Sequence, residues 1–198
     1  MPSLKAIDVA TDTTGKAHAL QAAGIQAVGI YLRADRCSGA MVRGLKSVGI
    51  RLWSIWEKGL PTGSRYFNPA QGLADAGAAV TFAQQIGQPS GSQIFFAVDY
   101  DATVADMQDH VIPYFEAVHG YLRQHSYLAA VYGSGLVIRM LVDAGLAHSG
   151  QLAGAPKWQG FDPNMPGVSI MQGPTTAILG LVVDTDTVVD MSATWGSA

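Results

Sequence analysis

The chain has 198 residues, of which 48% are hydrophobic and 14% are charged, and its formal net charge at pH 7 is −3. This composition excludes a disordered chain, and the weakly acidic balance without a basic cluster excludes nucleic-acid binding through phosphate contacts. The single cysteine, Cys37, excludes an internal disulfide framework and a zinc site built from several cysteines. The sequence contains no stretch of about 18 apolar residues that would predict a membrane span. The length of 198 residues predicts one folded domain over residues 1–198.

Short apolar runs alternate along the chain with segments of helical periodicity. Strands are expected at Leu4–Ala10, Ile25–Leu32, Ile50–Trp56, Gln93–Val98, Leu128–Tyr132, Ser169–Gln172 and Leu181–Asp184, with a weaker one at Ala155–Gln159. Helices are expected at Lys16–Ala23, Ala40–Val48, Pro69–Ile86, Val104–Gln124 and Ser134–Ala144. Asn68 followed by Pro69 is a typical helix start. Glycines stand where helices should end, at Gly24, Gly49, Gly87 and Gly145.

Strands that alternate with helices of 8–20 residues indicate parallel βαβ units. The strands are almost wholly apolar, as expected where both faces of a parallel sheet are covered. Eight strand candidates with about five helices predict an α/β fold, a small helix-poor TIM-like (β/α) barrel. The competing architecture is a doubly wound open sheet.

Polar and aromatic side chains gather where the expected strands end. In both parallel architectures the chemistry collects at the C-terminal ends of the strands. Six of the 15 acidic residues fall there. In chain order the candidates are Asp8, Tyr31, Arg33, Glu57, Asp99, Asp101, Tyr132, Trp158, Gln172, Asp184 and Asp186. Residues two apart in a strand point to the same face, so Asp99 and Asp101, and likewise Asp184 and Asp186, are expected to face one cavity.

Carboxylates gathered in one cleft favour acid–base chemistry. Because like charges repel, at least one of them is expected to have a raised pKa. A protonated carboxylic acid beside an ionised one is the arrangement that glycoside hydrolysis requires. The tyrosine and tryptophan rings add flat apolar faces suited to stacking on sugars. The five histidines do not lie at strand ends, so the sequence does not support a serine- or cysteine-histidine enzyme.

Each candidate also has a plainer structural interpretation. Aspartate after a strand often forms a turn or a cap, which would account for Asp8, Asp99 and Asp184. Glu57 would then be a solvated loop residue paired with Lys58.

The remaining candidates have structural alternatives as well. Arg33 would pair with Asp35 or with a carboxylate of the barrel, and Tyr132 and Trp158 would be core aromatics. Four further acidic residues fall within expected helices and are interpreted as solvated faces: Asp75, Asp106, Asp109 and Glu116.

Several segments follow one another in an order typical of a known family. They are Ile7-Asp8, Gly29–Arg33, Gly49–Leu52, Gly72–Gly87 and Gln93–Asp101, continued by Tyr132-Gly133, Trp158, Gln172 and Asp184. In this order and spacing the chain resembles the DUF1906 family, a glycoside-hydrolase-like domain related to family 25 lysozymes. The resemblance covers nearly the whole chain, and Gln93–Asp101 is its most specific part.

The resemblance implies a small β/α barrel with a carboxylate-lined groove. Lysozymes of the related family cut the β-1,4 bond between N-acetylmuramic acid and N-acetylglucosamine, and their first-strand aspartate corresponds to Asp8. Their fourth strand ends in Asp-x-Glu, with the glutamate as proton donor, whereas this chain has Asp99-Tyr100-Asp101. Three possibilities follow from this difference. Asp101 is the proton donor to a substrate in a shifted position, Glu57 from the neighbouring strand is the proton donor, or the site binds the glycan without cutting it.

The sequence therefore predicts a peptidoglycan-directed, muramidase-like glycoside hydrolase. Asp101 or Glu57 would be the acid and Asp99 the second carboxylate, with Asp8 and Asp184 orienting the sugar. The substrate-binding candidates are Tyr31, Arg33, Tyr132, Trp158, Gln172 and Asp186. No cofactor or metal is expected, and the partner is peptidoglycan or a related glycan bound by a monomer. The alternatives are a non-catalytic module that binds cell-wall glycan and a hydrolase with a carboxylate-bound metal.

The expected location follows from the start of the chain. Residues 1–14 lack the basic segment and apolar run of a signal peptide. A wall-directed enzyme of this kind fits release like a phage endolysin, export by a dedicated system, or a mature form whose signal has been removed. Otherwise we expect a cytoplasmic protein.

Overall fold

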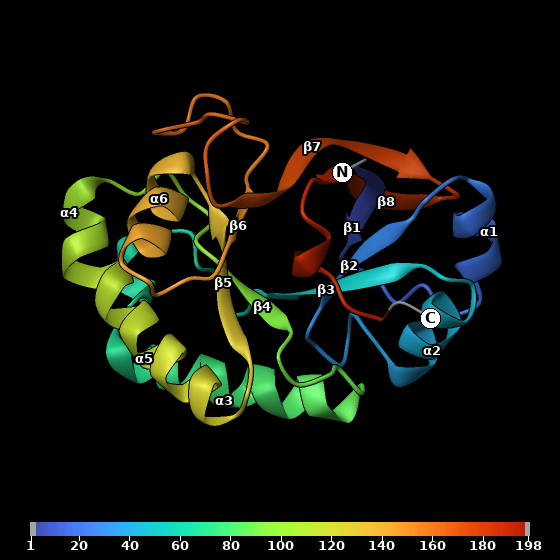
Figure 1. Cartoon of the computed structure of the whole chain (residues 1–198), viewed down its shortest axis with the longest axis horizontal. Helices are drawn as coiled ribbons and strands as arrows, with labels where there is room; N and C mark the ends of the chain where they lie inside the picture. Colours follow the sequence, from blue (N-terminus) through green and yellow to red (C-terminus); the bar gives the residue numbers. More distant parts are fainter. Residues whose placement is uncertain (1–2, 197–198) are drawn as a thin grey trace.

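Eight strands close into a barrel in the computed structural model, which describes residues 3–196 (Figure 1). The strands are β1 Leu4–Val9, β2 Ala27–Tyr31, β3 Arg51–Trp56, β4 Gln93–Ala97, β5 Leu128–Gly133, β6 Gly150–Leu152, β7 Val168–Ile178 and β8 Leu181–Val188. Each strand from β1 to β6 pairs in parallel with the next, whereas β8 is antiparallel to both β7 and β1. The predicted small barrel is confirmed, but its last strand runs the opposite way.

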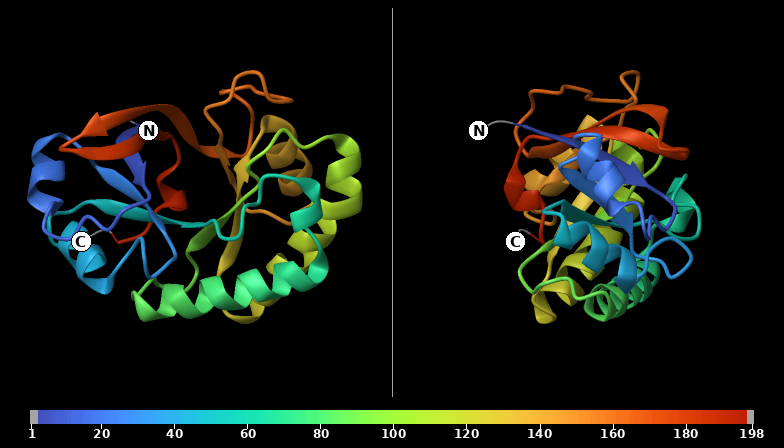
Figure 2. Two further views of the ribbon diagram at one scale, coloured as in Figure 1. Left: turned by 180° about the vertical axis from the view of Figure 1, so that it is seen from behind. Right: turned by 90° about the vertical axis from the view of Figure 1, so that its right-hand side faces the viewer.

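Helices follow the first five strands and are missing between β6, β7 and β8 within residues 3–196. They are α1 Ala17–Ala22, α2 Gly39–Ser47, α3 Pro69–Gln85, α4 Val104–Asp106, α5 Ile112–Gln124 and α6 Gly135–Asp143, with 3₁₀ turns at Ser64–Tyr66 and Met191–Ala193. Helices α3 and α5 pack side by side along one flank, and α1 and α2 cover the opposite end (Figures 1 and 2). None of the helices in this described range is long and apolar enough to cross a membrane.

The helix boundaries follow the local signals in the sequence. The Asn68 side chain accepts a hydrogen bond from the Gln71 N–H at 3.0 Å, with proline at the first helical position. The four glycines expected to end helices all have φ between 69° and 79°. The expected helix over 104–124 contains a π-helical turn at Met107–Val111. Pro113 follows that turn and lacks the N–H that would complete a regular α-helical ladder.

Three strand predictions need correction. The sixth strand is Gly150–Leu152, and the expected Ala155–Gln159 belongs to the loop that follows it. β7 extends to Ile178, well beyond the expected end at Gln172, because it forms a hairpin with β8. The expected parallel return to β8 is wrong, since only two residues separate Ile178 from Leu181 and a parallel crossover needs about a dozen.

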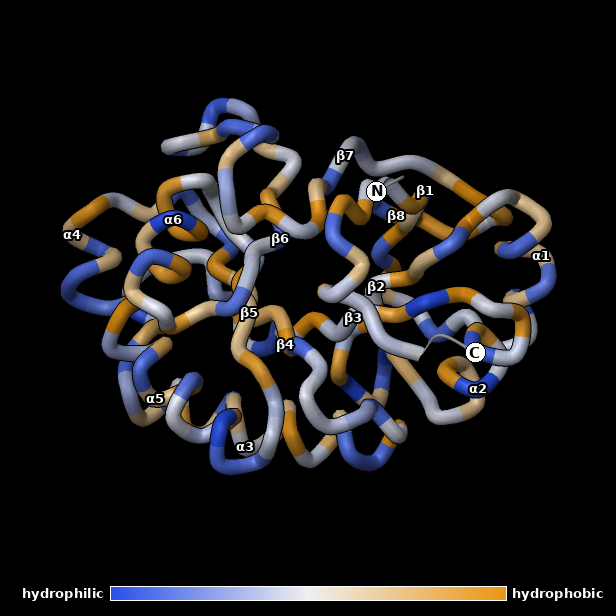
Figure 3. Tube along the Cα trace, in the orientation of Figure 1, coloured by the Kyte–Doolittle hydropathy of each residue, from blue (hydrophilic) through white to orange (hydrophobic). Residues whose placement is uncertain are grey.

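The barrel interior is layered by polarity. Its lower part is an apolar cluster that includes Ala6, Trp53, Phe95, Ile170 and Val188, all at most 1% exposed. Hydrophobic residues follow the strands and the inner helix faces, and hydrophilic residues mark the outer loops (Figure 3). Polar side chains occupy the inward positions nearer the C-terminal ends of the parallel strands.

A glycine makes room at the junction between these two layers. Gly29 faces inward on β2, and a Cβ there would lie 2.6 Å from the Trp53 ring and 2.7 Å from the Asp8 Cβ. Real Cβ atoms do not approach other atoms so closely. The absence of a side chain at Gly29 therefore allows Trp53 and Asp8 to sit against the strand.

Asp75 is a buried network residue, not part of a solvated face. Its side chain is 3% exposed, and its carboxylate accepts hydrogen bonds from the Tyr114 hydroxyl at 2.8 Å and the Gln71 amide at 3.0 Å. The Tyr66 hydroxyl lies 2.7 Å from both the Asp75 Oδ2 and the Lys58 carbonyl oxygen. This network fastens the segment after β3 to α3 and α5.

Candidate functional site

A cavity of about 290 Å³ opens at the C-terminal end of the parallel strands. Its lining is rich in carboxyl, hydroxyl and amide groups: Asp8, Tyr31, Ile55, Glu57, Asp99, Tyr132, Gln151, Gly154, Gln172, Gly173, Pro174, Thr175 and Asp184. These side chains come from all eight strands or from the residues directly after them. Strand periodicity explains the placement, since every second residue of a barrel strand faces inward.

The predicted site residues divide into two groups by position. Those that line the cavity are Asp8, Tyr31, Glu57, Asp99, Tyr132, Gln172 and Asp184. Those that do not are Arg33, Asp101, Trp158 and Asp186. The catalytic and substrate-binding roles assigned to the first group stay predictions.

Asp8 is held by three neighbours and is only 3% exposed. Its Oδ1 accepts from the Tyr31 hydroxyl at 3.2 Å, and its Oδ2 accepts from the amides of Gln172 at 3.3 Å and Gln151 at 3.4 Å. Burial, followed by the charge of Asp184, raises the pKa of Asp8 to about 7, and these three hydrogen bonds act in the opposite direction. The side chain is thus fixed in direction and close to its titration midpoint at neutral pH.

The two glutamines are themselves oriented by fixed donors. The Gln172 Oε1 accepts from the Tyr132 hydroxyl at 2.9 Å and from the Gly154 N–H at 3.1 Å. The Gln151 Oε1 accepts from the Trp53 indole N–H at 3.1 Å. Since each carbonyl oxygen is engaged, each amide nitrogen faces the carboxylates.

Gln172 also reaches Asp184, with its amide nitrogen 3.3 Å from Oδ2. The Thr175 hydroxyl donates to the other carboxylate oxygen of Asp184. A break in register of the β7–β8 pair between Gln172 and Thr175 lets both residues reach the same carboxylate.

Glu57 and Asp99 are the less restrained carboxyls of the cavity. Both are half-buried, and within residues 3–196 neither carboxylate accepts a hydrogen bond. Burial and then the charge of Asp99 raise the pKa of Glu57, and burial raises the pKa of Asp99. Their placement follows the inward alternation of β3 and β4, where Ile55 and Phe95 face inward two and four residues earlier.

Asp101 lies away from the cavity because the chain bends at Tyr100. The alternation expected to bring Asp101 beside Asp99 ends with the strand at Ala97. The exposed Asp101 carboxylate accepts a hydrogen bond from the Gln159 backbone N–H at 2.7 Å. It thereby fastens the loop between β6 and β7, which also carries the half-buried Trp158.

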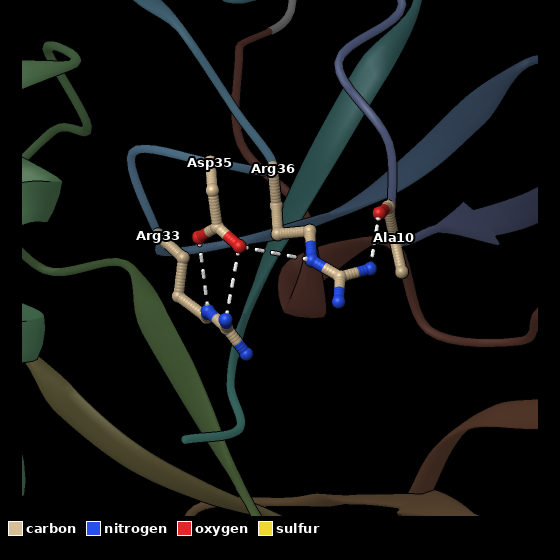
Figure 4. A network of polar contacts seen from close by, with 4 residues as sticks. All are labelled: Ala10, Arg33, Asp35 and Arg36. Atoms are coloured by element: carbon tan, nitrogen blue, oxygen red, sulfur yellow. Dashed lines mark hydrogen bonds and ion pairs between the residues drawn. The ribbon is translucent and has the colours of Figure 1, made fainter. Parts of the chain in front are cut away.

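Arg33 pairs with Asp35, one of the two structural alternatives for it (Figure 4). Its Nε and Nη2 donate to the two Asp35 oxygens at 3.1 and 2.9 Å. Arg36 donates to Asp35 at 3.3 Å and to the Ala10 carbonyl oxygen at 2.6 Å. The charges of Arg33 and Arg36 lower the pKa of Glu57 and so oppose the effect of its burial.

Gln151, Gly154 and Thr175 also line the cavity, and the sequence did not predict them. Gln151 lies on a strand of three residues, too short to show a pattern. Thr175 lies in the extension of β7 that only the hairpin reveals.

In residues 3–196 we find no group of three or more His, Cys, Asp or Glu side chains arranged to hold a metal ion.

Comparison with known proteins identifies the family. A family model described as the Rv2525c-like, glycoside hydrolase-like domain matches residues 18–172. The chain belongs to this family. The resemblance to DUF1906 is thereby confirmed, and this Rv2525c-like domain has a fold similar to that of peptidoglycan hydrolases.

Three relatives illustrate the similarity. The Bacillus subtilis protein FadG, itself described as uncharacterized, is 32% identical over 165 residues, which are 77% of this chain and 28% of FadG. The chain thus spans little more than a quarter of that relative. The Tat-secreted protein Rv2525c of Mycobacterium tuberculosis has a TM-score of 0.79 at 18% identity, covering 95% of both chains. The modular autolysin LytC of Streptococcus pneumoniae, solved with a synthetic peptidoglycan ligand, has a TM-score of 0.61 at 13% identity, covering 93% of this chain and 46% of LytC. These two structural likenesses concern the fold.

Proposed function

We propose that this domain hydrolyses the glycan strands of peptidoglycan, with Glu57 as the general acid and Asp99 as the second carboxylate. One observation carries the proposal: Glu57 and Asp99 face the same cavity with raised pKa values and without hydrogen bonds to their carboxylates from residues 3–196. The charge of an ionised Asp99 raises the pKa of Glu57 and so favours the protonated form of Glu57. That state provides an acid and a base at once.

The chemistry follows the two-carboxylate scheme of glycosidases. The Glu57 carboxyl donates its proton to the glycosidic oxygen while the bond from that oxygen to the anomeric carbon breaks. The ionised Asp99 balances the positive charge that develops on the sugar ring, and water supplies the hydroxyl group that the anomeric carbon gains. The proton released by that water restores the carboxyl pair.

The restrained side chains orient the sugar in this scheme. Asp8 and Asp184 are fixed by Gln172 and by their other partners, so they offer hydrogen-bond acceptors in set directions. Tyr31 and Tyr132 add aromatic surface to the cavity wall. Side chains held this way cost little entropy when substrate binds. Membership of a glycoside hydrolase-like family and the peptidoglycan ligand of LytC support this choice of substrate.

Digestion of purified peptidoglycan tests the proposal, with mass spectrometry of the released fragments. Wild type is expected to create new reducing ends, whereas Glu57→Gln and Asp99→Asn are expected to lose at least about 100-fold in rate. Asp101→Asn is the discriminating variant and is expected to retain activity. Asp109→Asn, an exposed carboxyl on the π-helical turn, is the matched control.

Other results would redirect the assignment. Loss of activity in Asp101→Asn alone would make Asp101 the acid for a substrate that binds nearer the β6–β7 loop. Absence of fragments together with intact wall pull-down would instead favour the non-catalytic glycan-binding module. Action on the wall also requires release or export of the protein, which is part of the proposal and is tested by fractionating the producing cells.

A further inference from the structure

Asp186 lies inside the barrel below the cavity. It faces Ala6 in the β1–β8 pair, one inward step below the level at which Asp8 faces Asp184. Its side chain is 5% exposed. The Oδ1 atom accepts a hydrogen bond from the Gln151 amide at 3.1 Å, while the buried Oδ2 atom has no hydrogen-bond partner among residues 3–196. A buried carboxyl oxygen without a partner calls for an explanation, because such atoms are rare.

The surroundings of Asp186 favour an uncharged carboxyl group. The titratable groups that face it are Asp8 on β1, Asp184 on its own strand and, beyond Asp8, Tyr31 on β2. Each of these is neutral or negative. The ion pairs in the described part of the chain join Arg33 and Arg36 to Asp35 at the rim, so no cation compensates Asp186. An ionised carboxylate buried in this way is costly, which favours the protonated form of Asp186.

Gln151 connects Asp186 to the site. Its Oε1 is held by the Trp53 indole, so both hydrogens of its amide nitrogen point to carboxyl groups. One goes to Asp186 at 3.1 Å and the other to the Asp8 Oδ2 at 3.4 Å. With the ring of Trp53 on one side and Asp186 on the other, the amide has one orientation available.

We propose that Asp186 is a positioning residue, an uncharged buried acid that holds the Gln151 amide against Asp8. The inference rests on the proposed function in one respect, the role of Asp8 in orienting the sugar. Asp186 adds an acceptor for Gln151 without adding a negative charge beneath Asp8. Consistent with this, burial and then the charges of Asp8 and Asp184 raise the pKa of Asp186 well above its ordinary value, although the Asp8 backbone N–H and the Gln151 amide act in the opposite direction.

Nuclear magnetic resonance of protein labelled with carbon-13 at the aspartate carboxyls tests this without any turnover. The Asp186 resonance, assigned by its loss in Asp186→Asn, is expected to remain that of a protonated acid at neutral pH. The Asp8 resonance, assigned with Asp8→Asn, reports its titration midpoint in each variant. A resonance of Asp186 that titrates like an exposed aspartate would overturn the proposal.

The variants separate positioning from charge. Asp186→Asn keeps an acceptor for Gln151 and adds no charge, so the Asp8 midpoint is expected to stay within about 0.3 pH units of wild type. Asp186→Leu removes the acceptor, and Gln151→Leu removes the donor to Asp8. Both are expected to move the Asp8 midpoint upward, Gln151→Leu by about one pH unit. Asp109→Asn is the control that leaves it in place.

The outcomes are distinct from those of the peptidoglycan assay. A lowered Asp8 midpoint in Asp186→Asn would mean that a negative charge has been removed, which contradicts an uncharged Asp186. An unchanged midpoint in both leucine variants would leave Asp186 with a packing role alone and overturn the positioning role. If Asp186→Leu does not fold, Asp186→Asn and Gln151→Leu still decide. If Asp8 and Asp186 titrate as expected but the protein cleaves no glycan, the positioning role of Asp186 holds and the proposed function is wrong.

Discussion

Asp8 and Asp184 lie directly opposite each other in the antiparallel β1–β8 pair, and the Gln172 amide nitrogen lies 3.3 Å from a carboxylate oxygen of each. Like charges at directly opposed positions destabilise a strand pair. The amide shared between them offsets part of that repulsion and fixes the relative orientation of the two side chains. The shared Gln172 amide therefore helps to hold these two acidic groups side by side.

Replacement of Gln172 by leucine removes the shared donor. Hydrogen bonds to charged groups contribute about 1.5–3 kcal/mol, so we expect kcat/KM on peptidoglycan to fall by tenfold or more. The pKa of Asp8 is expected to rise further, which nuclear magnetic resonance of the labelled aspartate carboxyls records as a titration profile shifted to higher pH. Gln85→Leu, an exposed glutamine at the end of α3, is the control. A profile for Gln172→Leu that superimposes on wild type would contradict this role.

Folding stability is expected to fall as the pH rises from about 4 to about 7. The pKa of Asp8 is raised from 3.8 to about 7 in the folded protein, and that of Asp186 is raised in the same direction. Within this window the folded state keeps protons that the unfolded chain has released, so folding is favoured at the acidic end. The slope reaches about 1.4 kcal/mol per pH unit for each proton. Urea unfolding at several pH values measures it.

The variant Asp8→Asn provides the control for that slope, because it cannot release a proton. Its unfolding free energy is expected to depend less on pH over the same window. Stability of the wild type that increases with pH between about 4 and 7 would show that the buried carboxyls are ionised throughout.

Gly29→Ala is expected to destabilise the barrel by about 1–3 kcal/mol, the usual cost of overpacking. The added methyl group would meet the Trp53 ring and Asp8 at less than 3 Å. Gly120→Ala is the matched control, because a Cβ at this exposed position of α5 meets nothing within 4 Å. It is expected to stabilise the helix by about 0.5–1 kcal/mol. Thermal unfolding compares the two, and equal effects would show that Gly29 is not closely packed.

Leu179→Asn is expected to stabilise the β7–β8 hairpin by about 0.5–1 kcal/mol. Leu179 and Gly180 form a two-residue turn with φ of 52° and 76°, a type I′ geometry for which Asn-Gly is preferred. Leucine at such a φ carries a steric cost that asparagine largely avoids. Leu179→Ala removes the exposed side chain but keeps the strain, so it separates the two effects. If Leu179→Asn has the same denaturation midpoint as Leu179→Ala, the strain attributed to leucine at this positive φ is refuted.

Chelation is expected to leave glycan cleavage unchanged. Amide and hydroxyl groups donate hydrogen bonds to Asp8 and Asp184, and in the proposed scheme Glu57 and Asp99 transfer the proton and balance the charge themselves. Assays with and without EDTA, followed by addition of Mg²⁺ or Ca²⁺, test this. A loss of rate that the metal restores would favour the hydrolase with a carboxylate-bound metal.

Much of the barrel is readable in the sequence because most of its signals are local. Asn68-Pro69 and the helix-ending glycines mark boundaries, and strands β1 to β5 are long enough to show apolar runs. β6 has only three residues, so it carries too little pattern to be recognised. The direction of β8 depends on a two-residue turn whose leucine is unusual at positive φ. Turn chemistry therefore misled the prediction there.

The site was predictable where strand alternation continues to the cavity, as for Asp8, Glu57 and Asp99. It was not predictable where the chain leaves the strand, because Asp101 follows a bend and no sequence spacing reports the direction of a loop. Asp186 shows a further limit. Its alternation correctly turns it inward, but sequence alone does not tell an inward residue at the mouth from one in the floor.

Because β8 runs antiparallel to β7, the wall of the cavity on that side is a hairpin that can be lengthened. Gly173, Pro174, Thr175 and Asp184 form one wall of the cavity, and β7 continues past them to the turn at Leu179. Because strand faces alternate with a period of two, adding one residue to each arm of the hairpin beyond Thr175 and Asp184 would heighten this wall without turning either residue away. No other strand need move. The hairpin is thus a place where loop grafting can change the shape of the cavity mouth while the barrel beneath stays the same.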